Sequence, residues 1–137
     1  MATTSFRFEV PGQPPSWNAA YRIVKIKGHG GLAKTPECLE YQMYLASPAA
    51  RRAKPPDFPW VKPQQLRVRY WFQLDHWVDS TNCLKILEDG IAHGLGIDDR
   101  YYLSCIEELS TGHKDPRTIV EVSLLSVVRS PPEEVRT

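Results

Sequence analysis

The sequence has few cysteines and no long apolar run, and these absences exclude several classes of protein. Its three cysteines, Cys38, Cys83 and Cys105, are widely spaced and form no Cys-x-x-Cys motif. This pattern argues against a disulfide framework or a structural zinc site and predicts free thiols. No stretch reaches the about 18 apolar residues of a transmembrane helix, and the first residues lack the apolar core of a signal peptide. We therefore expect a cytoplasmic protein with no membrane partner.

The net charge of +1 hides an uneven distribution along the chain. Residues 1–69 contain 11 Lys or Arg and 4 Asp or Glu, whereas residues 70–137 contain 6 and 12. The first half is therefore basic and the second half acidic. This asymmetry predicts a basic surface from one half and an acidic cluster from the other. The alternative is that folding mixes the two halves into an ordinary charged surface.

Hydrophobic periodicity predicts a small layered domain. Alternating or apolar runs rich in β-branched and aromatic residues predict strands over residues 6–10, 66–74, 101–109 and 118–128. The last two strands are separated by a turn-rich segment, which favours a hairpin with a longer loop. The expected fold class is α+β (mixed α/β), with a roughly four-stranded mixed sheet and two main helices. We assign residues 1–129 to this domain and residues 130–137 to a polar C-terminal tail.

Two helices and two irregular stretches complete this prediction. Thr35 and Pro36 are typical of a helix start, and the helix is expected to run to about Ala46. Residues 16–34 are polar and basic and contain several glycines, so they are expected to be partly a flexible loop. Residues 47–63 hold five of the twelve prolines and are expected to form a long surface connection rather than a helix.

The second predicted helix, residues 79–94, presents two distinct faces. At 100° per residue one face is apolar, with Cys83, Leu87 and Ile91. The opposite face presents Asp79, Asn82, Lys85 and Asp89, with Ile86 as its one apolar member. Such a polar stripe is usually only the solvated face of an amphipathic helix. Asp79 is also well placed to cap the helix.

A second acidic element gives the polar stripe a possible chemical role. Asp98 and Asp99 lie in a short connection between this helix and the next predicted strand. Because few residues link helix and strand, we expect their adjoining ends to come close. Adjacent carboxylates repel one another and gain from a shared cation, and hard oxygen ligands suit Mg²⁺ or Mn²⁺. Lys85 would then offset charge on a phosphate.

These motifs together resemble the RusA family of Holliday-junction resolvases, which are crossover junction endodeoxyribonucleases. The resemblance rests on Asp-x-x-Asn-x-x-Lys from Asp79, a further aspartate one helical turn later, the Asp98 and Asp99 pair, and the upstream Pro14-Pro15-Ser16-x-Asn18. It covers most of residues 5–126. It implies a homodimer that cuts four-way junctions and other branched DNA with Mg²⁺ or Mn²⁺.

The resemblance also implies roles for individual residues. Asp79, Asp98 and Asp99 match metal-binding positions, with Asp98 as a ligand or base, and Lys85 matches the catalytic lysine. Asn82 and Asp89 are expected to support the metal site. Thr81 departs from the family pattern, because a carboxylate is usual at that position. Asp75, Asp89 or Asp98 would have to supply the missing charge; the alternative is a weak or inactive protein that only binds branched DNA.

DNA contacts are expected from the basic N-terminal half. Arg22, Lys25, Lys27 and Lys34 lie near Trp17 and Tyr21, a composition that favours binding to a phosphate backbone. A solvated loop is the alternative. Two further alternatives for the whole protein are a Mg²⁺-dependent hydrolase of small phosphoesters and a structural protein whose acidic residues are only surface charge.

Overall fold

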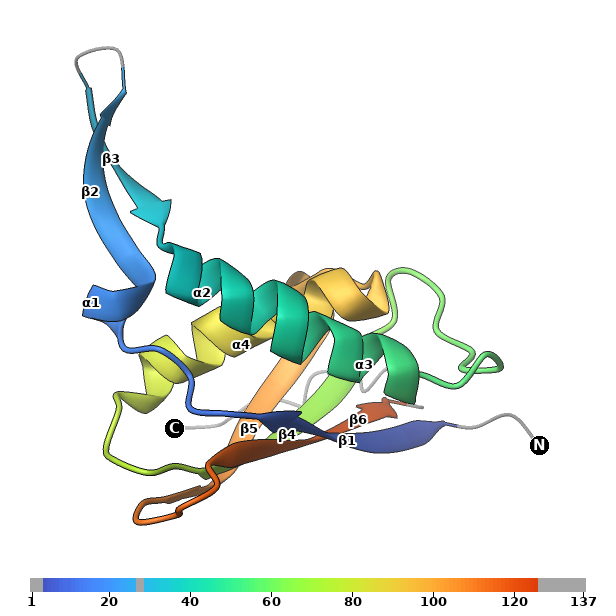
Figure 1. Ribbon diagram of the computed structural model, residues 1–137. Helices are drawn as coiled ribbons and strands as arrows, with labels where there is room; N and C mark the ends of the chain where they lie inside the picture. The colour runs from blue at the N-terminus through green and yellow to red at the C-terminus, as the bar shows by residue number, and fades with distance from the viewer. Residues whose placement is uncertain (1–3, 27–28, 126–137) are drawn as a thin grey trace, which may run out of the picture.

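The computed structural model describes residues 4–26 and 29–125, and these form a mixed sheet with helices on one face (Figure 1). The elements in chain order are β1 (Ser5–Pro11), α1 (Trp17–Ala20), β2 (Tyr21–Ile26), β3 (His29–Lys34), α2 (Pro36–Glu40), the π-helix η1 (Tyr41–Ala46), α3 (Ser47–Ala53), β4 (Leu66–Gln73), α4 (Ser80–Leu95), the 3₁₀-helix η2 (Asp99–Tyr101), β5 (Tyr102–Ser110) and β6 (Arg117–Leu124). This confirms the predicted small α+β class with a four-stranded mixed sheet.

The strand order of the main sheet is β1-β6-β4-β5. β4 and β5 are parallel and are joined through α4, whereas β6 is antiparallel to both β1 and β4. The predicted hairpin of the last two strands is therefore wrong, because β4 lies between them. The turn-rich segment that follows β5 reverses the chain direction, but it does not determine which strands β6 pairs with. Of the predicted strand 118–128, residues 126–128 lie outside the described residues, as does the tail 130–137.

One face of the sheet and the apolar face of α4 form the core. Every second residue of β4 is fully buried: Leu66, Val68, Tyr70 and Phe72. The α4 residues Cys83, Leu87 and Ile91 belong to the same buried cluster. Removing a side chain of this size from water stabilises the fold by about 1.5–3 kcal/mol. Among the described helices, none combines the length and apolar composition needed to cross a bilayer.

The helical layer continues further than the sequence predicts. Residues 47–53 were expected to belong to a surface connection, but they form α3, which follows α2 and η1 without a break. Pro48 lies in the first turn of α3. The π-helical turn just before it widens the helix where the proline ring would otherwise meet the carbonyl of the preceding turn. The connection to β4 is correspondingly shorter.

The basic stretch before α2 is also more regular than expected. β2 and β3 pair as an antiparallel two-stranded sheet, so the prediction of a partly flexible loop over residues 16–34 is wrong for the described part of that stretch. Ile23, Val24 and Ile26 supply the β-branched residues that favour a strand. Figure 1 shows this pair projecting from the rest of the fold beside α1.

α4 packs unusually close to the helix that runs from α2 to α3. A Cβ atom added to Gly94 would lie 2.2 Å from the carbonyl oxygen of Ser47, and one added to Gly90 would lie 2.8 Å from the Cβ of Ala46. Only glycine permits this approach. The contact fixes the C-terminal half of α4, which includes Asp89, relative to the other helices.

Candidate functional site

α4 begins at Asp79, whose carboxylate caps the helix. Its Oδ1 accepts hydrogen bonds from the backbone N–H groups of Thr81 at 2.9 Å and Asn82 at 3.4 Å. These groups would otherwise lack a partner in the first turn. The capping role considered for Asp79 in the sequence is therefore confirmed, and the side chain remains exposed.

The structure places Asp98 and Asp99 at the other end of α4. The helix has 16 residues, so its rise separates its two ends by about 24 Å. Asp79 and this pair therefore do not lie in one site within a single chain. Because β4 and β5 are parallel, α4 must return along the whole length of the sheet before β5 can begin.

A pocket of about 560 Å³ lies at this C-terminal end of α4. We call it the acidic pocket. It is lined by Lys34, Met43, Asp89, Ala92, His93, Asp98 and Asp99. Four of these residues were singled out in the sequence, and the pocket brings them together from β3, α4 and the link to β5.

The surroundings of Asp98 and Asp99 shift their pKa values in opposite directions. The pKa of Asp99 is raised by partial loss of solvent, by a hydrogen bond with Asp98 and by the charges of Asp89 and Asp98. The pKa of Asp98 is lowered, because its carboxylate accepts hydrogen bonds from the backbone N–H of Arg100 at 2.9 Å and from its guanidinium at 3.2 Å. Asp98 is therefore the more readily ionised of the pair.

Glu88 adds a fourth carboxylate that the sequence analysis did not identify. Its Oε2 accepts hydrogen bonds from the buried Tyr70 hydroxyl at 2.8 Å and from the Ser104 hydroxyl. Burial raises the pKa of Glu88, and the charges of Asp99 and Asp89 add to this effect. One feature of the sequence could have identified Glu88: it is an acid on the apolar side of an amphipathic helix, where a charged group needs partners.

Lys34 is the cation of the acidic pocket. Its Nζ donates to Oε1 of Gln42 at 3.0 Å and lies 3.4 Å from Oδ2 of Asp89. Gln42 is fully buried in η1, and its Nε2 donates to the carbonyl oxygen of Ile86 at 2.9 Å. The lysine is thus fixed by a buried amide that is itself fixed to α4.

The remaining predicted residues lie elsewhere. Lys85 is exposed one helical turn before Asp89 and makes no hydrogen bond or ion pair with the described residues. Asn82 is half-buried in the first turn of α4, away from the acidic pocket. The backbone of Arg22 and Lys25 lies in β2, and Lys27 lies outside the described residues. Ile86, which interrupted the polar stripe, is buried against Ala20 and Cys38.

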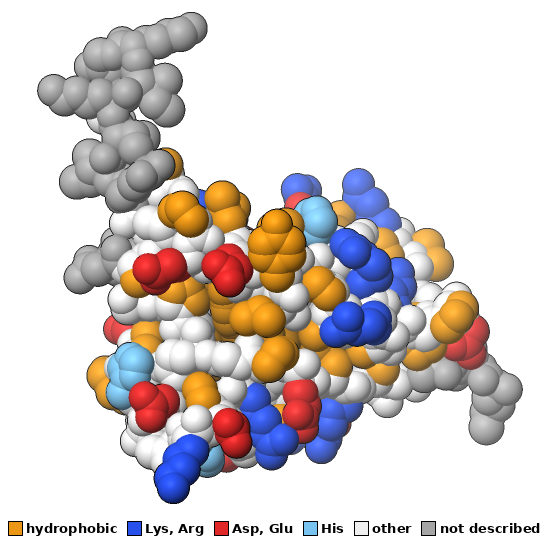
Figure 2. Space-filling view, in the orientation of Figure 1, with side chains coloured by type: hydrophobic (Ala, Val, Ile, Leu, Met, Phe, Trp, Pro, Cys, Tyr) orange, Lys and Arg blue, Asp and Glu red, His pale blue; other side chains and the backbone are white. Residues whose placement is uncertain are grey.

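Basic residues lie beside the acidic pocket on α3. His93, which lines the pocket, shares a hydrogen bond of 2.9 Å between its Nδ1 and Oγ of Ser47. Arg51 donates to the same Oγ at 3.4 Å, and Lys54 donates to the carbonyl oxygen of Leu95 at 3.2 Å. Figure 2 shows basic side chains gathered over the α3 end of the helical layer. Arg51 and Lys54 had no predicted role, because the prolines of residues 47–63 indicate a surface connection.

The carboxylates of the acidic pocket suit Mg²⁺ only as part of an open site that water and substrate complete. Among the described residues, no group of three or more His, Cys, Asp or Glu side chains is arranged to hold a metal ion. Mg²⁺, however, usually keeps several waters and binds through one or two carboxylates together with substrate phosphates. Asp98 and Asp99 fit that kind of open site.

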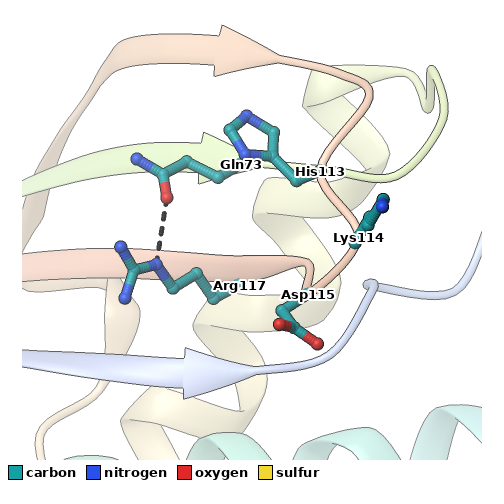
Figure 3. Close-up of a pocket in the computed structure, with 5 residues that line it drawn as sticks. All are labelled: Gln73, His113, Lys114, Asp115 and Arg117. Atoms are coloured by element: carbon teal, nitrogen blue, oxygen red, sulfur yellow. Dashed lines mark hydrogen bonds between the residues drawn. The ribbon is translucent and has the colours of Figure 1, made fainter.

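A second pocket of about 380 Å³ lies where β4 ends and β6 begins (Figure 3). It is lined by Gln73, His113, Lys114, Asp115 and Arg117. The guanidinium of Arg117 is already engaged, since its Nε donates to Oε1 of Gln73 at 3.0 Å and its Nη1 pairs with Glu9 at 2.9 Å. With only one acid among its lining residues, it is the weaker candidate for metal-dependent chemistry.

Comparisons with known proteins add no assignment. No protein-family model matches the chain, and no curated protein matches it either.

Proposed function

We propose that the protein is a Mg²⁺- or Mn²⁺-dependent endodeoxyribonuclease that cuts branched DNA, including four-way junctions. The observation that carries the proposal is the acidic pocket, which Asp89, Asp98 and Asp99 line together with Lys34, whose ammonium lies 3.4 Å from Asp89. Repelling carboxylates beside a cation and a basic flank are suited to a phosphodiester and a divalent metal. The RusA resemblance of the sequence motifs supports the same reaction.

Each residue of the acidic pocket has a distinct part in the proposed hydrolysis. Asp98 and Asp99 would hold the metal, and Asp98 is the better ligand at low pH because its pKa is lowered. Bound Mg²⁺ supplies acidification of water and positive charge for the phosphate oxygens. Asp89 fixes the nearby ammonium, and Glu88 fixes the start of β5 through Ser104.

DNA would approach the acidic pocket along its basic flank. Arg51, Arg52 and Lys54 lie at the end of α3, and Lys34, the last residue of β3, lines the pocket itself. Contacts of this kind bind the backbone without reading its sequence. We therefore expect binding that depends on DNA shape and salt rather than on base sequence.

A homodimer is part of the proposal because of the length of α4. The family pattern gives Asp79 a catalytic role, yet Asp79 is about 24 Å from Asp99 along the helix of 16 residues. A second copy related by a two-fold axis is able to present its Asp79 end to the acidic pocket of the first. Two equivalent sites would also suit symmetric cutting of a junction.

A junction-cleavage assay tests this proposal. The wild-type protein is expected to nick labelled four-way DNA with Mg²⁺ or Mn²⁺ and to stop when EDTA is added. Asp99→Asn should lower the rate about 10³-fold, since it removes a metal ligand worth several kcal/mol. Junction binding without cutting, at any metal concentration, would instead favour the inactive DNA-binding protein.

Mixing two inactive variants tests the shared site. If Asp79 and Asp99 act across the dimer, a mixture of Asp79→Asn and Asp99→Asn should recover about a quarter of the wild-type activity, because mixed dimers contain one intact site. Each variant alone is the control. A mixture no more active than its components would place the two residues in separate functions, leaving Asp79 as a helix cap.

A further inference from the structure

We propose that Lys34, held in place by the buried Gln42, is the residue whose ammonium contacts the scissile phosphate at the acidic pocket. The family pattern gives that role to Lys85, so the structure points to a different residue. The inference rests on the proposed function, since it assigns a role within the same reaction. Lys34 was expected only to contact the DNA backbone; this inference places its ammonium on the scissile phosphate itself.

The position of Lys34 supports this role. Its Nζ lies 3.4 Å from Asp89, and the side chain lines the pocket together with Asp98 and Asp99. The side chain is 35% exposed, so one side of the ammonium remains open to a ligand. Lys34 is the one Lys or Arg among the described residues that line the pocket.

The contacts around Lys34 make its position rigid. Thr35, the next residue, caps α2, and its backbone N–H donates to the carbonyl oxygen of Ala20 at 2.8 Å. Gln42 is fully buried, and its amide joins the Lys34 ammonium to the Ile86 carbonyl of α4. A pre-positioned cation stabilises developing charge without the cost of ordering it during the reaction.

The π-helical segment explains how Gln42 reaches this point. It belongs to η1, where the helix is wider than an α-helix, and such turns often occur at functional sites. Gly90 of α4 lies directly against the Gln42 backbone, because an added Cβ would be 3.1 Å from both its Cα and its carbonyl oxygen. The close helix contact therefore positions the amide, and the amide positions Lys34.

Lys85 lacks these features. It is exposed, and it makes no contact with the described residues that would fix its ammonium. A flexible surface lysine must lose side-chain entropy before it can stabilise a phosphate. Lys85 is therefore the matched control for Lys34: the same side chain, one helical turn from Asp89, without the buried amide.

The experiment compares Lys34→Met and Lys85→Met in the full-length protein under single-turnover conditions on a four-way junction. Lys34→Met is expected to lower the cleavage rate about 100-fold, whereas Lys85→Met should change it less than about threefold. Lys34→Arg should restore part of the rate, because it returns the positive charge. Gln42→Met should lower the maximal rate while leaving junction affinity nearly unchanged, since it frees Lys34 without removing a backbone contact.

Mn²⁺ binding gives a readout that does not depend on cutting. The positive charge of Lys34, which lines the same pocket as Asp98 and Asp99, opposes a cation bound there, so Lys34→Met should tighten Mn²⁺ binding about fivefold, measured by electron paramagnetic resonance. Lys85→Met should leave it unchanged. If Lys34 only anchors β3 to α4, Lys34→Met should lower the free energy of unfolding. It should then change neither the Mn²⁺ affinity nor the cleavage rate of the folded protein.

The outcomes separate this inference from the proposed function. A wild-type protein that cuts no branched DNA with either metal would overturn the proposed function, and this role with it. A wild-type protein that cuts, combined with a Lys85→Met loss as large as that of Lys34→Met, would overturn only the role of Lys34. An unchanged Mn²⁺ affinity in Lys34→Met would likewise overturn its placement beside the metal-binding carboxylates.

Discussion

The two ends of α4 carry the same kind of side chain in opposite electrostatic states. At the N-terminal end, the single carboxylate of Asp79 accepts two backbone hydrogen bonds and satisfies the positive end of the helix dipole. Toward the C-terminal end, Asp89 from the middle of the helix lines the acidic pocket together with Asp98 and Asp99, which follow the helix. Burial and neighbouring charges raise the pKa of Asp99 and of Glu88, the residue before Asp89.

This contrast shows where the molecule has chemistry to offer. The Asp79 carboxylate is used by the fold, so its removal should cost stability. In the acidic pocket, by contrast, burial and the charges of Asp89 and Asp98 oppose ionisation of Asp99, so this carboxylate gains from a cation that binds beside it. The residue type alone does not tell whether an aspartate on a helix stabilises the fold, as Asp79 does, or is held against its neighbours, as Asp99 is. The surrounding groups decide this. The following predictions test the contrast in order of decreasing effect.

The largest effect is expected from disturbing the close contact at the C-terminal half of α4. Gly94→Ala places a Cβ 2.2 Å from the Ser47 carbonyl oxygen, so the helices must move apart. We expect a loss of about 3 kcal/mol in the free energy of unfolding, measured by urea denaturation. Thr81→Ala, at the exposed N-terminal end, is the control and should cost less than about 0.5 kcal/mol. Equal effects at both ends would show that the contact is loose.

Mg²⁺ should stabilise the protein through one end only. At ten times its dissociation constant, a ligand of the folded state adds about 1.4 kcal/mol. Mg²⁺ should raise the midpoint temperature of thermal unfolding of the wild type and of Asp79→Asn, but not that of Asp99→Asn. No shift in the wild type would favour the structural protein considered from the sequence.

The capping role of Asp79 should be separable from its charge. Asp79→Ala removes the acceptor for two N–H groups and should cost about 1 kcal/mol of stability. Asp79→Asn retains a good capping side chain and should be nearly neutral. Chemical denaturation measures both changes. If Asn is as destabilising as Ala, the charge of Asp79 contributes more than its hydrogen bonds.

The pH dependence of stability should reflect the raised pKa of Glu88. Its folded pKa exceeds the ordinary value of 4.5, so its contribution to stability is complete below that value and is lost as the pH rises through the folded pKa. Glu88→Gln should remove this loss and flatten the stability profile above about pH 4.5. Urea denaturation between pH 4 and 7 measures it, with the exposed Glu40→Gln as the control. A steeper profile in Glu88→Gln would contradict the direction of the shift.

Local patterns in the sequence predicted the elements that carry the site. The alternation in β4, the amphipathic α4 and its cap at Asp79 all depend on neighbouring residues, and the structure confirms each of them. The acids of the pocket were also recognisable, because Asp89, Asp98 and Asp99 stand out by type and spacing.

Long-range geometry could not be obtained in this way. The parallel pairing of β4 with β5 separates Asp79 from Asp99, yet no residue near either strand indicates which strands will pair. Lys34 and Asp89 come from elements far apart in the chain, and they meet beside the close helix contact that glycine at position 90 permits. Pro48 suggested a break in the helix, but the π-helical turn before it accommodates the ring.

The fixed length of α4 has a consequence for how this chain can vary in size. One residue inserted into the helix would rotate everything beyond it by about 100° and advance it by about 1.5 Å. An insertion before Gly90 would turn Gly90 and Gly94 away from the helix that runs from α2 to α3, and it would displace Asp98 and Asp99 from the acidic pocket. Insertions and deletions should therefore be tolerated in the connections at residues 54–65 and 111–116. The length of α4, 16 residues, should stay constant.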